Sequence, residues 1–212
     1  MKKPTMKDKP TVKDRFSDLP DHLIHQIMSL RSLTEATRFS TLSKRMSSPW
    51  ISFPVLEFES TALCQSPHKQ LMILTFVRES LKRRRAARLL NFKRLSFRVF
   101  VDHYEVSRSV EEVLENLLEF AIHNKVIELE LSLDHSLTDY QRMKSMPEAI
   151  FYSQTLREIS LSGLKFSSNH HLILYCPSIE DFSIFGCIGF RSVVVAPSAK
   201  LIKRIQIDDA FT

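Results

Sequence analysis

Apolar residues recur at one fixed spacing along most of the chain. An apolar residue is followed by a second three positions later and by a third two positions after that. The spacing occurs six times, at Phe53, Leu56, Phe58; Phe92, Leu95, Phe97; Val126, Leu129, Leu131; Leu156, Ile159, Leu161; Ile179, Phe182, Ile184; and Ile202, Ile205, Ile207. Four copies extend by three further positions, to Phe100, Leu164, Cys187 and Ala210. Each alternating pair predicts a short strand with both side chains on one face, and such units bury that face only by stacking.

Helices are predicted between the strands. Residues 69–90 hold leucines at helical spacing among basic residues, and residues 110–123 form the clearest apolar stripe. Capping boxes are predicted at Ser109 with Glu112 and at Ser145 with Glu148, the second starting a short helix. The strand, helix, strand order predicts an α/β fold with a curved parallel sheet. The spacing is that of leucine-rich repeats, arranged as a short, irregular solenoid. The alternative is an unrelated α/β domain whose apolar triplets agree by chance.

The first 52 residues follow a different pattern. Residues 1–15 are rich in lysine and predict a disordered basic tail. Asp18 is predicted to cap a first helix with Pro20 in its first turn. The apolar face of that helix holds Leu23, Ile24, Ile27, Met28 and Leu30.

Two further short helices are predicted in this region. One begins at Thr34, and one runs from Ser40 to Trp50 and stops near Pro49. Three short helices form only a small core, so this unit is expected to take stability from a partner or a neighbouring domain. The chain therefore divides into residues 1–15, 16–52 and 53–212.

Composition narrows the classes of function. The chain has 212 residues, of which 43% are hydrophobic and 25% charged, as in globular proteins. Of the formal net charge of +6, residues 1–15 hold +4 (six basic residues against two acidic), so the charge is a weak argument for nucleic-acid binding. No apolar run is long enough for a membrane helix, no secretory signal is expected, and the three glycines form no phosphate-binding loop.

The remaining candidate groups have plain structural interpretations. His22 with His25, and the loose cluster of His170, His171 and Cys176, could each ligate a metal, but neither has a placed ligand set and no metal is expected. The three cysteines, Cys64, Cys176 and Cys187, are odd in number and far apart, which favours a reducing compartment and, for the last two, packing.

A basic run is the strongest charged feature outside the tail. It comprises Lys82, Arg83, Arg84, Arg85 and Arg88. It could be a nuclear-localisation signal or a patch for an acidic partner, but the solvated face of a helix is the favoured interpretation. The alternation of basic and aromatic residues from Phe92 to Arg98 is better explained by a strand than by a nucleic-acid stripe. No nucleophile motif is present, so no catalytic residue and no cofactor are expected.

The N-terminal pattern resembles a known family. The segment from Asp18 to Leu30, then Thr34 to Ala36, Leu42 to Arg45, and Trp50 resemble the F-box of plant F-box/leucine-rich-repeat proteins, with no gap in the spacing. Later segments resemble that family too, among them Leu117 to Ala121 and Tyr175 to Asp181. The resemblance covers roughly residues 15–212.

The resemblance implies a non-catalytic substrate receptor. F-box proteins of this kind bind a Skp-family adaptor, and through it a cullin, and hold a protein substrate near a ubiquitin-conjugating enzyme, which raises effective concentration. The cysteine pattern and the absence of targeting segments in the sequence favour the nucleus, the cytoplasm or both. No membrane partner is expected, and a nucleic-acid partner is disfavoured. The residues implied to contact the adaptor are Leu19, Pro20, Leu23, Ile27, Leu30, Leu42, Ser43, Lys44, Arg45 and Met46.

Departures from the family pattern keep other interpretations open. Arg31 and Ser32 stand where the family has Leu-Pro, and Met46 stands where it has Trp. Because aromatic anchors often dominate interface energy, weaker adaptor binding is expected. The chain stops at Thr212, directly after a predicted strand, so a truncated C-terminal edge is also expected. The alternatives are a degenerate or truncated F-box interaction protein acting outside the ligase and, less favoured, a nucleic-acid-binding repeat protein.

Overall fold

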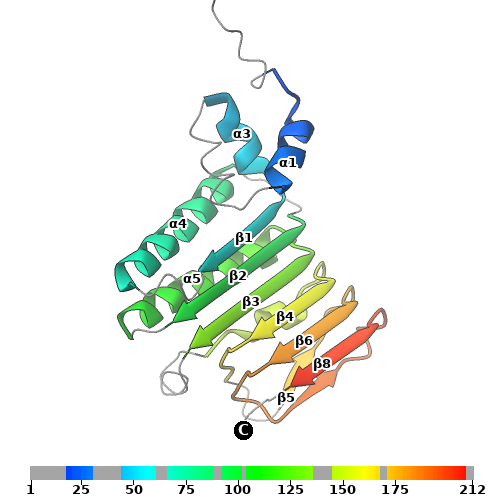
Figure 1. Ribbon diagram of the computed structural model, residues 1–212. Helices are drawn as coiled ribbons and strands as arrows, with labels where there is room; N and C mark the ends of the chain where they lie inside the picture. The colour runs from blue at the N-terminus through cyan, green and yellow to red at the C-terminus, as the bar shows by residue number, and fades with distance from the viewer. Residues whose placement is uncertain are drawn as a thin grey trace, which may run out of the picture. The chain divides into compact units, whose positions relative to one another are not determined.

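The structure is a computed structural model with two compact units. It describes residues 18–30, 44–60, 66–87, 92–101, 104–135, 145–167 and 171–208 (Figure 1). The first unit is Met1–Trp50 and the second is Ile51–Thr212. Each has its own secondary structure.

The first unit contains helix α1 (Asp21–Ser29), and helix α3 (Lys44–Ser52) runs from it across the boundary. Pro20 is the N-cap of α1, and its carbonyl accepts hydrogen bonds from the amides of Leu23 and Ile24 at 3.0 and 3.2 Å. The predicted cap at Asp18 is therefore wrong. Pro49 lies inside α3 and does not stop it. Proline has no N–H, so α3 forgoes the one bond that residue 49 would donate to the carbonyl of Arg45. The helix predicted from Thr34 lies outside the described residues.

The second unit is built on a six-stranded parallel sheet whose strands follow one another in chain order. The strands are β1 (Val55–Ser60), β2 (Arg94–Val101), β3 (Glu128–His135), β4 (Glu158–Ser162), β6 (Asp181–Phe185) and β8 (Arg204–Asp208). The six predicted apolar pairs align across the sheet: Leu56, Leu95, Leu129, Ile159, Phe182 and Ile205 form one row, and Phe58, Phe97, Leu131, Leu161, Ile184 and Ile207 form the next. The predicted mixed α/β fold with a parallel sheet is confirmed.

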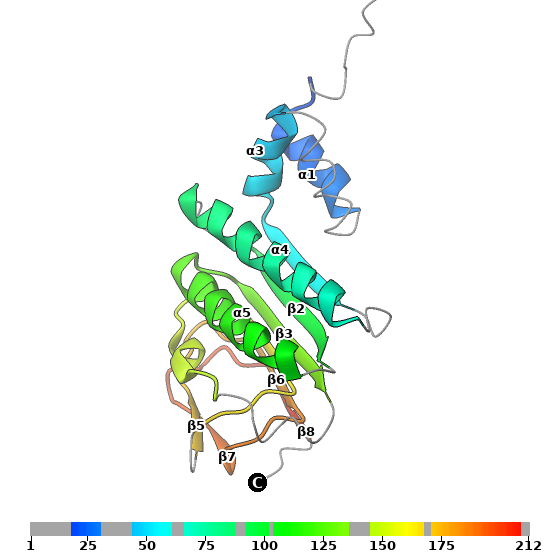
Figure 2. The same ribbon diagram turned by 90° about the vertical axis from the view of Figure 1, so that its left-hand side faces the viewer.

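Three helical segments connect the strands: α4 (Pro67–Ala86), α5 (Tyr104–His123) and the 3-10 helix η2 (Glu148–Tyr152). Helices α4 and α5 lie side by side on one face of the sheet (Figures 1 and 2). Helix α5 begins six residues earlier than predicted because Val106 extends the buried stripe that includes Val110. The capping box at Ser109 is therefore wrong. None of the described helices has the length and apolar character to cross a bilayer.

A second, two-stranded parallel sheet was not predicted. It consists of β5 (His171–Leu174) and β7 (Ser192–Val195). The end of β5 lies against η2. The backbone amide of Tyr175, the residue after β5, donates a hydrogen bond to the carbonyl of Phe151 in η2 at 2.8 Å. Pro147 is the N-cap of η2 and no side chain caps this helix, so the second predicted capping box, at Ser145 and Glu148, is wrong as well.

Aromatic side chains form the core between the two sheets. The ring of Phe151 lies 5.6 Å from that of Phe166 and 6.1 Å from that of Phe182, measured between centroids. Of the predicted extensions of the repeats, Leu164 and Cys187 are fully buried. Phe100 is only half-buried and Ala210 lies outside the described residues. Phe100 points away from the core because β2 continues through Val99 and Val101, which are buried instead.

Candidate functional site

An apolar ridge runs along the exposed side of α1. The ridge consists of Leu23 and Ile27, which are half-buried, and Leu30, which is 83% exposed. Residues three and four positions apart lie on one helical face, so the three side chains are neighbours. Ile24 and Met28 point the other way and are buried. Helix α1 therefore has both a packed apolar side and an unpacked one.

Polar contacts fix α1 against α3. The Arg45 guanidinium donates to the carbonyl of Leu19 at 3.0 Å and lies 2.6 Å from a carboxylate oxygen of Asp21. His25 Nε2 lies within hydrogen-bond distance, 2.9 Å, of the carbonyl oxygen of Pro49. These contacts hold the beginning and the middle of α1, so the ridge has a defined direction within this unit.

The residues predicted to contact an adaptor fall into three groups. Leu19, Pro20, Leu23, Ile27 and Leu30 are at least partly exposed. Arg45 is half-buried and bonded within the unit, and Met46 is 2% exposed. Lys44 is the first residue of α3, while Leu42 and Ser43, like Arg31 and Ser32, lie outside the described residues. The structure thus brings together the part of the predicted set that lies on α1. The role of the set stays a prediction.

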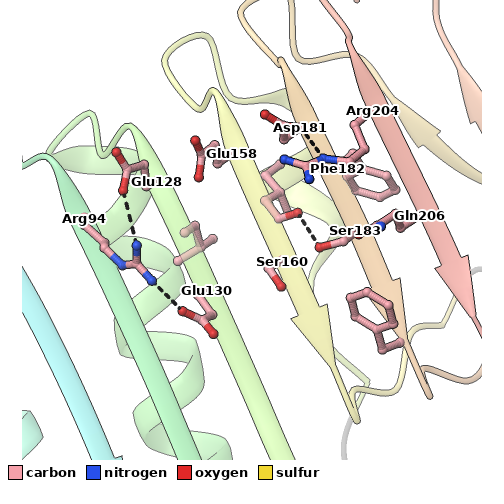
Figure 3. A pocket seen from close by; sticks show the side chains of 13 residues that line it. Arg94, Glu128, Glu130, Glu158, Ser160, Asp181, Phe182, Ser183, Arg204 and Gln206 are labelled. Atoms are coloured by element: carbon pink, nitrogen blue, oxygen red, sulfur yellow. Dashed lines mark hydrogen bonds and ion pairs between the residues drawn. The ribbon is translucent and has the colours of Figure 1, made fainter.

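A second surface, the polar sheet face, lies opposite α4 and α5. No described element covers it (Figure 1). Its side chains stand in rows across the strands: Arg94, Glu128, Glu158, Asp181 and Arg204; Glu57, Ser96, Glu130, Ser160, Ser183 and Gln206; and Glu59, Arg98, Ser132, Ser162, Phe185 and Asp208. A hollow of about 290 Å³ lies over the first two rows (Figure 3). The rows follow from strand alternation, since residues beside each inward apolar pair point outward.

Glu130 is the centre of an ionic cluster on this face. Its carboxylate accepts hydrogen bonds from Arg98 Nε at 2.7 Å, from Arg94 at 3.0 Å and from the Ser96 hydroxyl at 3.1 Å. Burial alone would raise the pKa of Glu130, but the hydrogen bond and charge of Arg98, aided by Ser96 and Arg94, outweigh burial and hold that pKa below its usual value. Arg94 also reaches Glu57 at 3.3 Å. The cluster is therefore charged at neutral pH.

The far end of the polar sheet face has its own ion pairs. Arg204 Nε lies 2.7 Å from a carboxylate oxygen of Asp181, and Lys203 lies 2.6 Å from Glu180. The hydrogen bond and charge of Asp181 raise the pKa of Arg204, and those of Lys203 lower the pKa of Glu180. Glu158, between the two clusters, is exposed.

The polar sheet face is acidic on a basic chain. Its three rows hold seven carboxylates and three guanidiniums, a balance of −4, whereas the whole chain has a formal net charge of +6. The rows were not predicted, although a charged residue precedes the inward pair in five of the six strands. A surface of this kind is suited to contacts made by charge and hydrogen bonding.

The basic run is not simply a solvated helix face. Arg84 is fully buried, and burial lowers the pKa of its guanidinium to about 9. Arg85 donates at 2.9 Å both to the carbonyl of Asn116 and to the carboxylate of Glu119 on α5. Lys82 and Arg83 are exposed, and Arg88 lies outside the described residues. Arg84 is therefore packed inside the unit, and Arg85 links α4 to α5.

The cysteines within the described ranges are packing residues. Cys176 and Cys187 are fully buried free thiols, and burial raises the pKa of each to about 11. The thiol of Cys176 donates to the carbonyl of Ile150 at 3.3 Å. Among the described residues, no three His, Cys, Asp or Glu side chains are placed to hold a metal ion.

Three Arabidopsis thaliana proteins are similar to this chain. An F-box/FBD/LRR-repeat protein is 32% identical over 150 residues, which cover 71% of this chain and 27% of that protein. An F-box protein is 23% identical over 213 residues, which cover 92% of this chain and 52% of that protein. Another F-box protein is 27% identical over 188 residues, which cover 87% of this chain and 37% of that protein. No protein-family model matches the chain. The chain thus spans about half the length of these relatives or less.

Proposed function

Because this chain belongs to the family of plant F-box/leucine-rich-repeat proteins, we propose that it is the substrate-receptor subunit of a Skp–cullin–F-box ubiquitin ligase. Residues 16–52 are the F-box, a three-helix unit that binds a Skp-family adaptor and through it a cullin. Residues 53–212 are a leucine-rich-repeat solenoid that binds a protein substrate. The protein performs no chemistry, and it acts in the nucleus, the cytoplasm or both. It raises the concentration of substrate near the conjugating enzyme.

The observation that carries the adaptor proposal is the apolar ridge on α1. A surface helix that leaves Leu30 83% exposed, beside Leu23 and Ile27, has apolar area that its own unit does not bury. Contiguous exposed apolar residues of this kind are typical of protein interfaces. The ridge consists of residues that the resemblance assigns to adaptor binding. Met46 is buried, so in this proposal it supports α3 from inside.

Capture of a recombinant Skp-family adaptor by the purified chain tests this proposal. Leu30→Asp places a carboxylate on the ridge and is expected to abolish capture. Ser29→Asp is the matched control, because it adds the same charge at the neighbouring exposed position, on a different side of α1. Loss with Leu30→Asp and retention with Ser29→Asp supports the proposal. Equal capture by both variants, with unchanged circular dichroism, would exclude the ridge as the adaptor site.

For the substrate, the polar sheet face is the surface we assign, with a Lys/Arg-rich segment of a protein as its ligand. The support is charge: seven carboxylates against three arginines on one uncovered face. Complementary charge speeds association and selects among partners. The hollow lined by Glu128, Glu158 and Asp181 gives an arginine or lysine side chain a place to enter.

Binding of a fluorescent Lys/Arg-rich peptide, followed by anisotropy, tests the substrate surface. Binding is expected to weaken as salt rises and to weaken further in Glu158→Lys. Glu79→Lys is the matched control, since Glu79 is an exposed carboxylate on α4, on the opposite side of the sheet. Equal binding to both variants would place the contact elsewhere.

The second candidate is an F-box interaction protein that acts outside the ligase. The observation that favours it is the departure at Arg31, Ser32 and Met46 from the family pattern. A folded wild-type chain that captures no adaptor, yet still binds basic peptide, is the outcome that would select this candidate.

A further inference from the structure

One aromatic side chain interrupts the polar sheet face. From β2 to β8, the three rows described above hold a single apolar residue, Phe185, at the end of β6. Its side chain is half-buried and lines the same hollow of about 290 Å³ as the acidic residues of the first row. Strand β6 lies between β4 and β8, so Phe185 has a strand on each side. The polar hollow therefore offers one apolar contact.

The hollow also contains a carboxylate that is left over by the ion pairs of this face. Four carboxylates line it, and arginines of the same face engage three of them. These are Glu128 and Glu130, at 3.6 and 3.0 Å from Arg94, and Asp181, at 2.7 Å from Arg204. Glu158 is exposed and forms no ion pair among the described residues, and Figure 3 shows it between the two clusters.

The strand register gives the separation of Glu158 and Phe185. Glu158 of β4 pairs with Asp181 of β6, and Phe185 follows four residues later on β6. A strand advances about 3.3 Å per residue, so the two groups are about 13 Å apart along the strands. Between them Ser160 and Ser183 line the hollow with small side chains. Glu158 and Phe185 thus lie at opposite ends of a floor of serines.

An extended peptide has the same spacing. Its residues i, i+2 and i+4 point to one side, and residues i and i+4 are about 13 Å apart. A chain that lies along β4 and β6 can place these three side chains over Glu158, over the serines and over Phe185. Charge selects a lysine or arginine for the first position. Burial of apolar area selects a large apolar side chain for the third.

We propose that the hollow recognises an extended substrate segment through two anchors four residues apart, a lysine or arginine on Glu158 and a large apolar side chain on Phe185. This pattern, which rests on the substrate surface proposed above, narrows the ligand from any Lys/Arg-rich segment to one with an apolar residue at a fixed spacing. Phe185 is the specificity-determining residue, because it separates basic segments that carry the same charge.

Anisotropy with three fluorescent peptides of equal charge tests the spacing. All carry three consecutive arginines. One has leucine four positions after the last arginine, one has leucine directly after it, and one has serine in place of leucine. Each is made in both chain orders, since a segment can run along the strands either way. The four-position peptide is expected to bind about fivefold more tightly than the others. The ratio is expected to persist as salt rises, because screening acts on charges.

Variants of the sheet face identify the apolar anchor. Phe185→Ser is expected to remove the advantage of the four-position peptide and to leave binding of the leucine-free peptide unchanged. Phe185→Leu keeps an apolar side chain and is expected to keep most of the advantage. Phe100→Ser is the matched control, because Phe100 is also half-buried and points outward, from β2, but does not line the hollow. Circular dichroism checks the fold of each variant.

The outcomes separate this pattern from the charge-based proposal. An advantage that is lost in Phe185→Ser and kept in Phe100→Ser supports the two anchors. Equal binding of the three peptides, or an advantage that survives Phe185→Ser, would overturn the pattern and leave the acidic surface standing. If none of the arginine peptides binds even at low salt, the substrate surface itself is wrong, and the two anchors are rejected with it.

Discussion

The two units differ in how much of their apolar pattern they bury themselves. In β2 and β3, Leu95, Phe97 and Leu131 are at most 1% exposed. In α1, by contrast, Leu23 and Ile27 are half-buried and Leu30 is almost fully exposed. The sheet of the second unit uses its apolar residues for folding. The helical unit keeps part of them on its surface, and in our proposal the adaptor covers that part.

Strand β8 refines the comparison within the second unit. It has the same apolar spacing as its neighbours, yet Ile205 and Ile207 remain about half exposed. Outermost position alone does not explain the difference, since Leu56 and Phe58 of the other outermost strand, β1, are 0% and 3% exposed. Helix α4 covers β1, where the ring of Phe76 packs against that of Phe58. The spacing thus predicts which face of a strand is apolar, and the neighbours decide how far that face is buried.

The largest effect is expected from a core residue of an inner strand. Phe97→Ala removes a fully buried ring from β2 and is expected to cost about 3–5 kcal/mol of unfolding free energy. Ile207→Ala in the outermost strand, measured at low protein concentration, is expected to cost less than about 1 kcal/mol, because the side chain is half exposed. Urea unfolding measures both. Equal losses would contradict the difference in burial between the strands.

A smaller but still large loss of stability is expected from a substitution at Gly189, which lies between β6 and β7. Its φ is +89°, and a Cβ at this position would lie 1.9 Å from the carbonyl oxygen of Phe166. Gly189→Ala therefore forces the backbone to move and is expected to cost more than about 2 kcal/mol. Gly186→Ala, at φ +52°, is the comparison and is expected to cost about 1 kcal/mol. If thermal unfolding shows no difference between the two, the close approach to Phe166 has no consequence.

A moderate, pH-dependent effect is expected on the polar sheet face. The Glu130 side chain is 19% exposed and accepts from Arg94, Arg98 and Ser96, so Glu130→Gln is expected to cost about 1 kcal/mol at neutral pH. Because the folded pKa of Glu130 is lowered, its contribution is full above the unfolded pKa of about 4.3 and is lost as pH falls through the folded value. The difference in unfolding free energy between wild type and Glu130→Gln, measured by urea unfolding at several pH values, should therefore shrink below about pH 4. A difference that is constant with pH would mean that the charge of Glu130 does not stabilise the fold.

The smallest effect on stability is expected on the apolar ridge. Leu30→Asp is expected to change the unfolding free energy of the isolated chain by less than about 0.5 kcal/mol, because Leu30 is 83% exposed. The same variant is expected to lose the adaptor. A large loss of stability in the chain alone would mean that the fold, and not a partner, uses this side chain.

Much of the second unit could be predicted from the sequence. The pairs Leu95, Phe97 and Leu129, Leu131 gave both the strands and their register, since alternation leaves few other ways to bury them. Local capping patterns were less informative. The Ser109 capping box was overridden because Val106 and Val110 continue the apolar stripe of α5. Packing of that stripe outweighs the free energy of a single cap.

The candidate sites were predictable in part. Leu23, Ile27 and Leu30 could be recognised as a helical face, but helical spacing alone does not say which half of an apolar face is packed. The sheet of β5 and β7 was missed because two four-residue strands give too short a periodicity to detect. The cluster around Glu130 depends on strands far apart in the chain, so it became visible only with the register.

The most direct test of the central claim is hydrogen–deuterium exchange of the full chain with and without a recombinant Skp-family adaptor. If the helical unit exposes its ridge for the adaptor, the amides of α1 (Asp21–Ser29) should become strongly protected on binding, while those of β2 and β3 exchange as before. Unchanged exchange in α1 at saturating adaptor, or protection that appears only in the sheet, would contradict the account.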